Sequence, residues 1–416
     1  MQLQIKASGR KLADPASESA DGDGRRISAA APLSVRLHNR MEPLEARWRA
    51  IETENHLSLH QGYDWCRAWV ETHACRVLVI EGVRDGRTQF ILPLEIVRRG
   101  PVRTAHLIAT AFSNINTGLY AEEFGSPAAG ARLREALEQA RGQLARFFDL
   151  LLLEKVPLDW RGRRSPFAAL PSGLNQNAAF QLELFGSFEQ TLAQLNAKRR
   201  RKKFRSSERR LAALGGYEHV VAPPGAQALD LLAVFFRQKA ARFEAMGLPD
   251  VFRDEATRDF FRRLTVMPAA DGNYPLQLHA LRLQGEHEGH IAAVTGLSRK
   301  GDHVVCQFGS IDDSVAADAS PGEFLFHLAI QKLCGEGARL FDFGIGDQPY
   351  KRSWCRIETA QHDLMWPATL TGRAAAGAHR AKTAAKRLVK QNPRAYSLLQ
   401  RIRFGRRDIS GGAEPG

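Results

Sequence analysis

The segment Phe341–Lys351 gathers residue types that can move protons. Its sequence is Phe-Asp-Phe-Gly-Ile-Gly-Asp-Gln-Pro-Tyr-Lys. The apolar alternation predicts a strand and the glycines predict a break after it, so we expect Asp342 at the strand end. Asp347, Tyr350 and Lys351 would then lie on the following loop, where sites are often built. A carboxylate there can accept a proton from an attacking amine, and a tyrosine can return one to a leaving thiolate. The alternative interpretation is that Asp342 pairs with Lys351 or caps local backbone.

The tetrapeptide Ser320-Pro-Gly-Glu323 is a predicted helix start. Serine at the N-cap, proline at the first helical position and glutamate at the third form a capping box. Because Gly322 leaves the first turn without a side chain, free backbone N–H groups and the helix dipole would face outward, as a phosphate site requires. The alternative is a well-capped helix without a ligand.

Positive charge is concentrated in two segments of a chain whose net charge is +14. Lys198–Arg210 holds nine basic residues and one acid, and Arg373–Arg407 holds eleven basic residues and no acid. Local basicity of this kind indicates an anionic partner. We expect the charges of the first segment to surround a helix, which is either solvated, bound to nucleic acid, or a clamp for an anionic substrate or phosphate. Only Phe204 interleaves them, so support for single-strand nucleic-acid binding is weak.

The composition is that of a globular chain with two domains. Its 416 residues are 44% hydrophobic and 25% charged, and are too many for one compact core. The chain has no run of about 18 apolar residues, so no transmembrane helix is predicted. Residues 1–33 lack the apolar core of a secretory signal. Five scattered cysteines without a Cys-x-x-Cys pair argue against a disulfide framework or a zinc site. We therefore expect a cytoplasmic protein without a metal.

The order of predicted elements repeats once along the chain. Each half has helices, an antiparallel hairpin, a further helix and a buried strand, which predicts a mixed α+β fold. Helices are predicted over residues 44–56, 61–72, 133–142, 188–214, 228–246, 256–266 and 322–335. Strands are predicted over residues 76–83, 88–97, 147–153, 276–283, 290–297, 303–310 and 339–344.

Four parts follow from this pattern. We expect a disordered leader over 1–34, a first domain over 35–180, a second domain over 181–370 and a basic helical tail over 371–416. The tail is expected to lie outside the core as one or two amphipathic helices interrupted at Pro393.

These motifs resemble the CelD-like GNAT acetyltransferases, which are bacterial proteins often associated with cellulose or other exopolysaccharide synthesis. The resemblance covers about residues 44–367. It is most specific in the basic run from Lys198, in Ser320-Pro-Gly322 and in the segment from Phe341 to Trp354. The family is distantly similar to the Fem-type peptidoglycan aminoacyltransferases, which also have two GNAT-like domains. The resemblance therefore implies tandem GNAT-like domains.

The resemblance implies transfer of an acetyl or other acyl group from an acyl-CoA to an amine or hydroxyl, without a covalent enzyme intermediate. In GNAT folds the CoA pyrophosphate lies at the N-terminus of the helix after the central strand. The usual Q/R-x-x-G-x-G/A signature of that loop is replaced here by Asp318-Ala-Ser-Pro-Gly322. Orientation would supply much of the acceleration, and backbone N–H groups of the central strand would stabilise the oxyanion.

The implied site residues fall into three groups. Those that would bind the acyl donor are Gln307, Phe308, Gly309, Ser320, Pro321 and Gly322. Those with catalytic roles are Asp342 or Glu323 as base and Tyr350 as acid. Those that would bind the substrate are Lys198, Arg199, Arg201, Asp347, Lys351 and Trp354.

Two other functions stand beside this one. An aminoacyl-tRNA-dependent, Fem-like transferase acting on a cell-wall precursor would use the two basic segments and bind tRNA with steep salt dependence. A non-catalytic GNAT-fold scaffold of a polysaccharide synthesis complex is favoured by the replaced phosphate signature, and its basic tail would contact an acidic membrane or partner. The expected acceptor is a small molecule, saccharide or peptide, and the second half is expected to be the active one.

Overall fold

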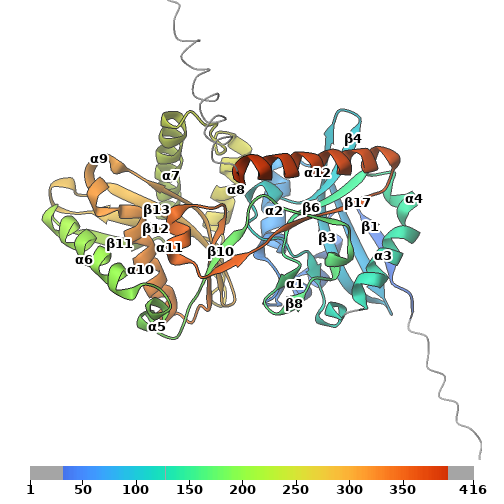
Figure 1. The fold of residues 1–416 in the computed structure, drawn as a ribbon, viewed down its shortest axis with the longest axis horizontal. Helices are drawn as coiled ribbons and strands as arrows, with labels where there is room; N and C mark the ends of the chain where they lie inside the picture. The colour runs from blue at the N-terminus through green and yellow to red at the C-terminus, as the bar shows by residue number, and fades with distance from the viewer. Residues whose placement is uncertain (1–30, 127, 392–416) are drawn as a thin grey trace, which may run out of the picture. The chain divides into compact units, whose positions relative to one another are not determined.

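The computed structural model describes residues 31–126 and 128–391. Most of the predicted leader and the end of the basic tail, including Pro393, lie outside these residues. The described part contains two large mixed sheets with helices on their faces (Figure 1). Within the described ranges, no helix has the length and apolar character needed to cross a membrane.

The first sheet is built mainly from the first half of the chain. Its order is β1-β2-β3-β4-β6-β17-β9, with β5 added beside β3. All neighbours run antiparallel except β4 and β6, which are parallel. The strands are β1 (Ser34–His38), β2 (Val77–Arg84), β3 (Arg87–Arg99), β4 (Val102–Leu107), β5 (Leu119–Tyr120), β6 (Leu150–Val156), β9 (Ser172–Leu174) and β17 (His362–Pro367). Its helices are η1 (Glu42–Leu44), α1 (Glu45–Glu52), η2 (Leu59–Gln61), α2 (Tyr63–His73), η3 (Thr110–Phe112), η4 (Glu122–Gly125), α3 (Ala129–Gln139), α4 (Arg141–Leu144) and η5 (Pro166–Ala169). A small separate hairpin joins β7 (Asp159–Trp160) and β8 (Arg163–Arg164).

The second sheet repeats the same arrangement. Its order is β11-β12-β13-β14-β15-β10-β16, again antiparallel except for one parallel pair, β14 and β15. The strands are β10 (Ala179–Glu183), β11 (Tyr217–Val221), β12 (Tyr274–Leu283), β13 (Ile291–Lys300), β14 (His303–Ile311), β15 (Leu340–Ile345) and β16 (Ile357–Thr359). The remaining helices of the chain, in order, are α5 (Phe188–Ala193), α6 (Ala197–Ala213), α7 (Ala226–Ala245), α8 (Glu255–Val266), η6 (Gly285–His287), α9 (Asp313–Ala316), η7 (Ala317–Ala319), α10 (Pro321–Gly335), α11 (Pro349–Trp354) and α12 (Leu370–Gln391). The predicted repeat of plan and the mixed α+β fold class are confirmed.

The two sheets exchange one strand each. Position by position, β17 in the first sheet corresponds to β10 in the second, yet β10 directly follows the first half in sequence and β17 follows the second. The prediction that residues 181–370 form one domain is therefore wrong at its end, because His362–Pro367 pairs with β6 of the first sheet. Hydrophobic alternation marked these strands but carried no information on which sheet they join.

The predicted single helix over 188–214 is two helices. The α5 helix ends at Ala193, and the Asn196 side chain accepts a hydrogen bond from the Arg199 N–H to cap the start of α6. Asparagine is a favoured N-cap because its side chain satisfies an N–H group that the first helical turn leaves free.

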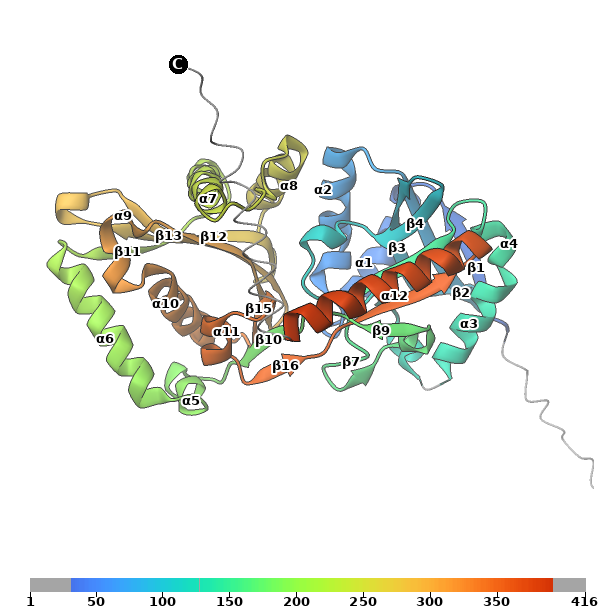
Figure 2. The same ribbon diagram turned by 45° about the horizontal axis from the view of Figure 1, so that its top comes forward.

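The tail was predicted to lie outside the core, but its α12 helix packs along one face of the first sheet, over β4, β6 and β17 (Figure 1, in red). Ala376 is buried in this contact. His379 on α12 contacts Asp363 on β17 at 2.9 Å. On the second sheet, α7 and α10 cover opposite faces (Figure 2).

Candidate active site

The two parallel strands of the second sheet separate after a short contact. They pair from His303–Leu340 to Val305–Asp342, whereas β14 continues to Ile311 and β15 to Ile345. A cavity of about 540 Å³ opens between them and reaches the start of α10. A gap at this point of a mixed sheet is a place where ligands bind, because backbone groups on both facing edges lack a neighbouring strand.

A bulge at Gln307 sets which backbone groups of β14 face this gap. The pairing with β13 shifts by one residue, so that Leu297 opposes Cys306 while Gly296 opposes Phe308. Beyond the shift the ladder alternates up to Asp312, whose N–H donates to the Ala292 carbonyl. This alternation turns the N–H and carbonyl of Gly309 to the open edge.

Only part of the predicted oxyanion contact fits this arrangement. The Phe308 backbone faces β13, and its carbonyl accepts the Thr295 hydroxyl at 3.0 Å. Gln307 is the unpaired residue of the bulge, and its side-chain amide lies 3.2 Å from His60 Nε2 of the first half. Among the three predicted donors, Gly309 is the one whose N–H the ladder directs into the gap.

The start of α10 forms the other end of the cavity, where Ser320, Pro321 and Gly322 line it as a group. The first helical hydrogen bond runs from the Phe324 N–H to the Ser320 carbonyl, and the N–H groups of Gly322 and Glu323 before it have no bond to the described residues. A Cβ on Gly322 would lie 2.7 Å from the Ile311 side chain, so glycine lets the helix start approach the end of β14. Free N–H groups at a helix start favour an anion.

The predicted capping box at this helix start is wrong. Ser320 adopts a left-handed conformation with φ 50°, and its side chain accepts no capping hydrogen bond. Glu323 instead turns toward α6, where its carboxylate lies 2.7 Å from Lys203 Nζ and 3.8 Å from Arg200. Glu323 lines the cavity mouth, but its carboxylate is engaged in these ion pairs and is not free for its predicted role as base.

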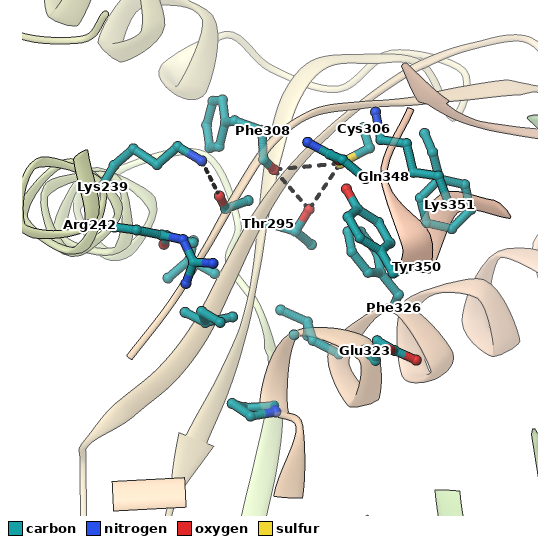
Figure 3. A pocket seen from close by; sticks show the side chains of 18 of the residues that line it. Lys239, Arg242, Thr295, Cys306, Phe308, Glu323, Phe326, Gln348, Tyr350 and Lys351 are labelled. Carbon is teal, nitrogen blue, oxygen red and sulfur yellow. Dashed lines mark hydrogen bonds between the residues drawn. The ribbon is translucent and has the colours of Figure 1, made fainter. Parts of the chain in front are cut away.

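Tyr350 points into the cavity from α11 (Figure 3). Its ring stacks on Phe326 with centroids 5.8 Å apart and planes inclined by 11°. Burial raises the pKa of the Tyr350 hydroxyl above its usual value of 10.0. The hydroxyl therefore stays protonated at neutral pH and can serve as a proton donor, the role predicted from the sequence.

Three basic side chains line the cavity. Lys239 Nζ on α7 donates to the Gly309 carbonyl at 3.0 Å, and the neighbouring Arg242 lies 3.7 Å from Asp313 (Figure 3). Lys351 Nζ donates to the carbonyls of Gly344 and Ile345 at 3.2 and 2.7 Å. Burial lowers the pKa of both lysines. Arg242, near the helix start, is the cation best placed for a substrate anion, whereas Lys351 is occupied by backbone.

Asp342 does not stand at a strand end, as predicted, but lies inside β15 and is fully buried. Its carboxylate accepts the Gly344 N–H at 2.7 Å and the Gln181 side chain at 3.3 Å, and it does not line the cavity. The glycines that predicted a break after the strand are real, with φ 77° at Gly344 and 98° at Gly346, but they follow the carboxylate by two residues or more. Asp342 thus caps local backbone, which was the alternative interpretation.

The other predicted substrate contacts lie away from the cavity. Trp354 is buried with the Arg200 guanidinium 3.6 Å from its ring, and Asp347 is paired with Arg352. Arg201 is paired with Glu189. None of these, nor Lys198 or Arg199, lines the cavity.

The charges of α6 are sorted by side rather than spread evenly. Arg200, Arg201 and Lys203 form ion pairs within the protein. Six exposed basic side chains form no ion pair with the described residues. Four of them lie at helical spacings of four, three and four along one stripe, namely Lys198, Lys202, Arg205 and Arg209, and the other two, Arg199 and Arg210, lie beside it.

Sequence reasoning missed several residues of the cavity. Lys239 and Arg242 lie three apart on α7, a spacing that puts them on one helix face, but nothing in the sequence connects that face to β14. Asn114 comes from the first half, in a polar stretch that carried no motif. Among the cysteines, the buried Cys306 reaches the cavity, and burial raises the pKa of its thiol.

Comparison with known proteins agrees with this geometry. Residues 198–352, from α6 to α11, match the model of the acetyltransferase (GNAT) domain family. A search of the curated proteins finds no match to this chain.

Among solved structures, one supports the fold and two others show weaker similarity. The chain resembles the crystal structure of FemX with a TM-score of 0.56 at 13% identity, covering 80% of this chain and 97% of that one. A C-terminal domain of a putative lysylphosphatidylglycerol synthetase from Agrobacterium fabrum gives 0.49 at 13% identity over 82% and 97%. A tandem GNAT protein from the clavulanic acid biosynthesis pathway gives 0.44 at 12% identity over 81% and 99%. At these identities the likeness to FemX shows a fold of two GNAT-like domains.

Proposed function

We propose that this protein transfers a short acyl group from an acyl-CoA to an amine or hydroxyl of a small-molecule, saccharide or peptide acceptor. The observation that carries the proposal is the cavity between β14 and β15. It is lined both by the start of α10, with its unbonded N–H groups, and by the protonated hydroxyl of Tyr350. The match of residues 198–352 to the GNAT domain family supports it.

The cavity residues fit an acyl-CoA. The N–H groups of Gly322 and Glu323, together with Arg242, offer an anion site for the donor's phosphates. From Cys306 to Ile311, β14 spans about 16 Å at ~3.3 Å per residue, which separates this site from the point where the strands part. The donor would supply an activated thioester carbonyl between these two ends, beside Gly309.

Two groups of this chain would act on the bound thioester, one on its carbonyl oxygen and one on its leaving sulfur. The Gly309 N–H on the open edge would donate to a carbonyl oxygen as negative charge develops there. Tyr350 stays protonated, and its hydroxyl would donate a hydrogen bond to the sulfur of the departing thiolate and stabilise the negative charge that develops there. Neither Asp342 nor Glu323 is placed as a base, so the acceptor would enter as a neutral nucleophile or lose its proton to water.

A thiol-release assay tests the proposal. Acetyl-CoA is supplied with panels of amines and saccharides, and melting temperatures are measured with acyl-CoAs and free CoA, since a ligand that binds the folded state raises them. Tyr350→Phe should lower kcat by about 100-fold if the phenol donates this hydrogen bond. The matched control is Tyr217→Phe, a tyrosine on β11 outside the cavity, which should keep full activity. No thermal shift with any CoA compound and no thiol release would contradict the proposal.

A second candidate is an aminoacyl-tRNA-dependent transferase. The observation in its favour is the stripe of exposed, unpaired charges on α6, because α6 also carries Lys203, which pairs with Glu323 at the cavity mouth. Salt-sensitive tRNA binding together with silence toward every acyl-CoA would favour this candidate. Silence toward both ligands would instead favour the non-catalytic scaffold.

A further inference from the structure

The gap between β14 and β15 is spanned by one side chain from the other half of the molecule. Asn114 follows η3 of the first half, and its amide lies between the two separating strands. Its Nδ2 donates to the Cys306 carbonyl on β14 at 3.2 Å, and its Oδ1 accepts from the Ile345 N–H on β15 at 3.5 Å. One side-chain amide thus replaces the ladder bonds that the strands would make if they stayed together.

The fit between Asn114 and β15 is close. Gly344 has φ 77°, and a Cβ built on it would lie 2.7 Å from Asn114 Oδ1 and 2.8 Å from Cγ. Any side chain at residue 344 would push the amide out of the gap. The left-handed conformation of Gly344 interrupts the regular backbone of β15 on this edge, and the bulge at Gln307 does the same for β14. The strands therefore have no regular ladder with which to close the gap without Asn114.

Asn114 is held from behind by buried groups. Its own carbonyl accepts the side-chain amide of Gln361 at 2.9 Å, and Gln361 is 1% exposed. On one side Lys155 Nζ donates to the Ser113 carbonyl at 2.9 Å, and on the other Asn116 Nδ2 donates to the Glu154 carbonyl at 2.7 Å. Because its neighbours are fixed by the first sheet, the amide occupies a set position in the gap.

Asn114 lies at the end of the cavity opposite to the anion site. The anion site at α10 adjoins Ile311, whereas Asn114 contacts Cys306 at the opposite end of the exposed part of β14. Phe343 and Tyr350 line the cavity as well. A donor with its phosphates at α10 would therefore extend its acyl group toward Asn114.

We infer that Asn114 is a specificity-determining residue, by which the first half closes one end of the acyl cavity and limits the length of acyl group it accepts. The inference rests on the proposed acyl-CoA donor. It gives the first half a part in the reaction without a reacting group of its own.

The test compares acetyl-CoA with hexanoyl-CoA for wild type, Asn114→Ala and Asn114→Asp. Asn114→Ala removes the amide and lengthens the cavity, so the ratio of kcat/KM for hexanoyl-CoA to that for acetyl-CoA should rise at least 10-fold. Asn114→Asp has the same size but cannot donate to the Cys306 carbonyl, so it should lower the melting temperature while leaving the ratio unchanged. If turnover is too slow to measure, the ratio of the dissociation constants for the two donors is compared instead.

The outcomes separate the two ideas. An equal loss with both donors in folded Asn114→Ala would overturn the inference and leave the proposed function standing, because a merely structural role lowers all rates alike. Wild-type protein that neither binds nor turns over any acyl-CoA would overturn the proposed function and this inference with it. If Asn114→Ala does not fold, Asn114→Ser replaces it with the same expected direction, and an unchanged ratio there counts equally against the inference.

Discussion

The two halves have the same strand order, but the space beside the parallel strand pair differs between them. In the second half, the short connection over residues 312–320 leaves the gap between β14 and β15 open as a cavity. In the first half, β4 pairs with β6 only at Thr104–Leu150 and Ala105–Leu151, and the connection over residues 108–128 is much longer. Asn116 from this connection donates its backbone N–H to the Lys155 carbonyl and its side chain to the Glu154 carbonyl, both on β6.

The difference teaches that connection length, rather than strand order, decides whether this fold keeps a binding cavity. The longer connection covers the edge of β6 with its own amide groups and then extends Asn114 into the neighbouring gap. The filled gap of one half thus supplies a part of the open gap of the other. Shared fold does not give the halves a shared function, because the function depends on the residues at this one position.

The largest effect should come from removing the backbone donor on the open edge. Gly309→Pro deletes the N–H that faces the gap and breaks no bond of the β13 ladder, since proline is tolerated where the N–H is not used in pairing. We expect kcat to fall by about 10²- to 10³-fold with the fold retained, as for loss of one oxyanion donor. Gly309→Ala is the control, because its Cβ would make an ordinary 3.6 Å contact and keep the N–H. Equal activity of the two variants would refute the role of this N–H.

A smaller effect should follow from removing the Asn116 side chain, which fills the gap beside β6 in the first half. Asn116 is fully buried, so Asn116→Ala leaves the Glu154 carbonyl and the Gln61 amide without their partner. The free energy of unfolding should fall by about 3 kcal/mol, measured by denaturant titration. Dissociation constants for acyl-CoA should stay within twofold in the folded variant, since Asn116 does not line the cavity. A selective loss of donor binding would mean that the first gap also has a ligand-binding role.

The smallest effect concerns the attachment of α12 to the first sheet. Burial acts to raise the pKa of Asp363, but hydrogen bonds from His379 and Asn175 outweigh it, and the pKa lies below the usual 3.8. A lowered carboxyl pKa adds stability that is complete above the unfolded value and is lost as the pH falls through the folded value. Asp363→Asn should therefore lower the unfolding free energy by about 1 kcal/mol at pH 7, and the gap to wild type should shrink below pH 3.8. A gap that stays constant with pH would show that the carboxylate charge is not what holds α12.

The elements that the sequence predicted correctly are those set by near neighbours in the chain. The hairpins, the helix start at Pro321 and the strand at Leu340 follow from local turn and alternation signals, and Ser320, Gly322 and Tyr350 all line the cavity. Asp342 was misplaced because alternation does not tell which face of a strand is covered. The roles of Asn114, Lys239 and Arg242 depend on contacts between segments far apart in the chain, which a pattern within one segment does not contain.

Because the two sheets exchange strands, the sheet whose synthesis begins first is completed last. The first sheet starts with β1 near residue 34, but its inner position between β6 and β9 stays empty until residues 362–367 leave the ribosome. The second sheet has all its strands once residue 359 is made, since β10 precedes the rest of it. The nascent chain must therefore carry β6 with an open edge through most of translation, a condition that invites wrong pairing. The part of the molecule that is translated first is the last to be completed.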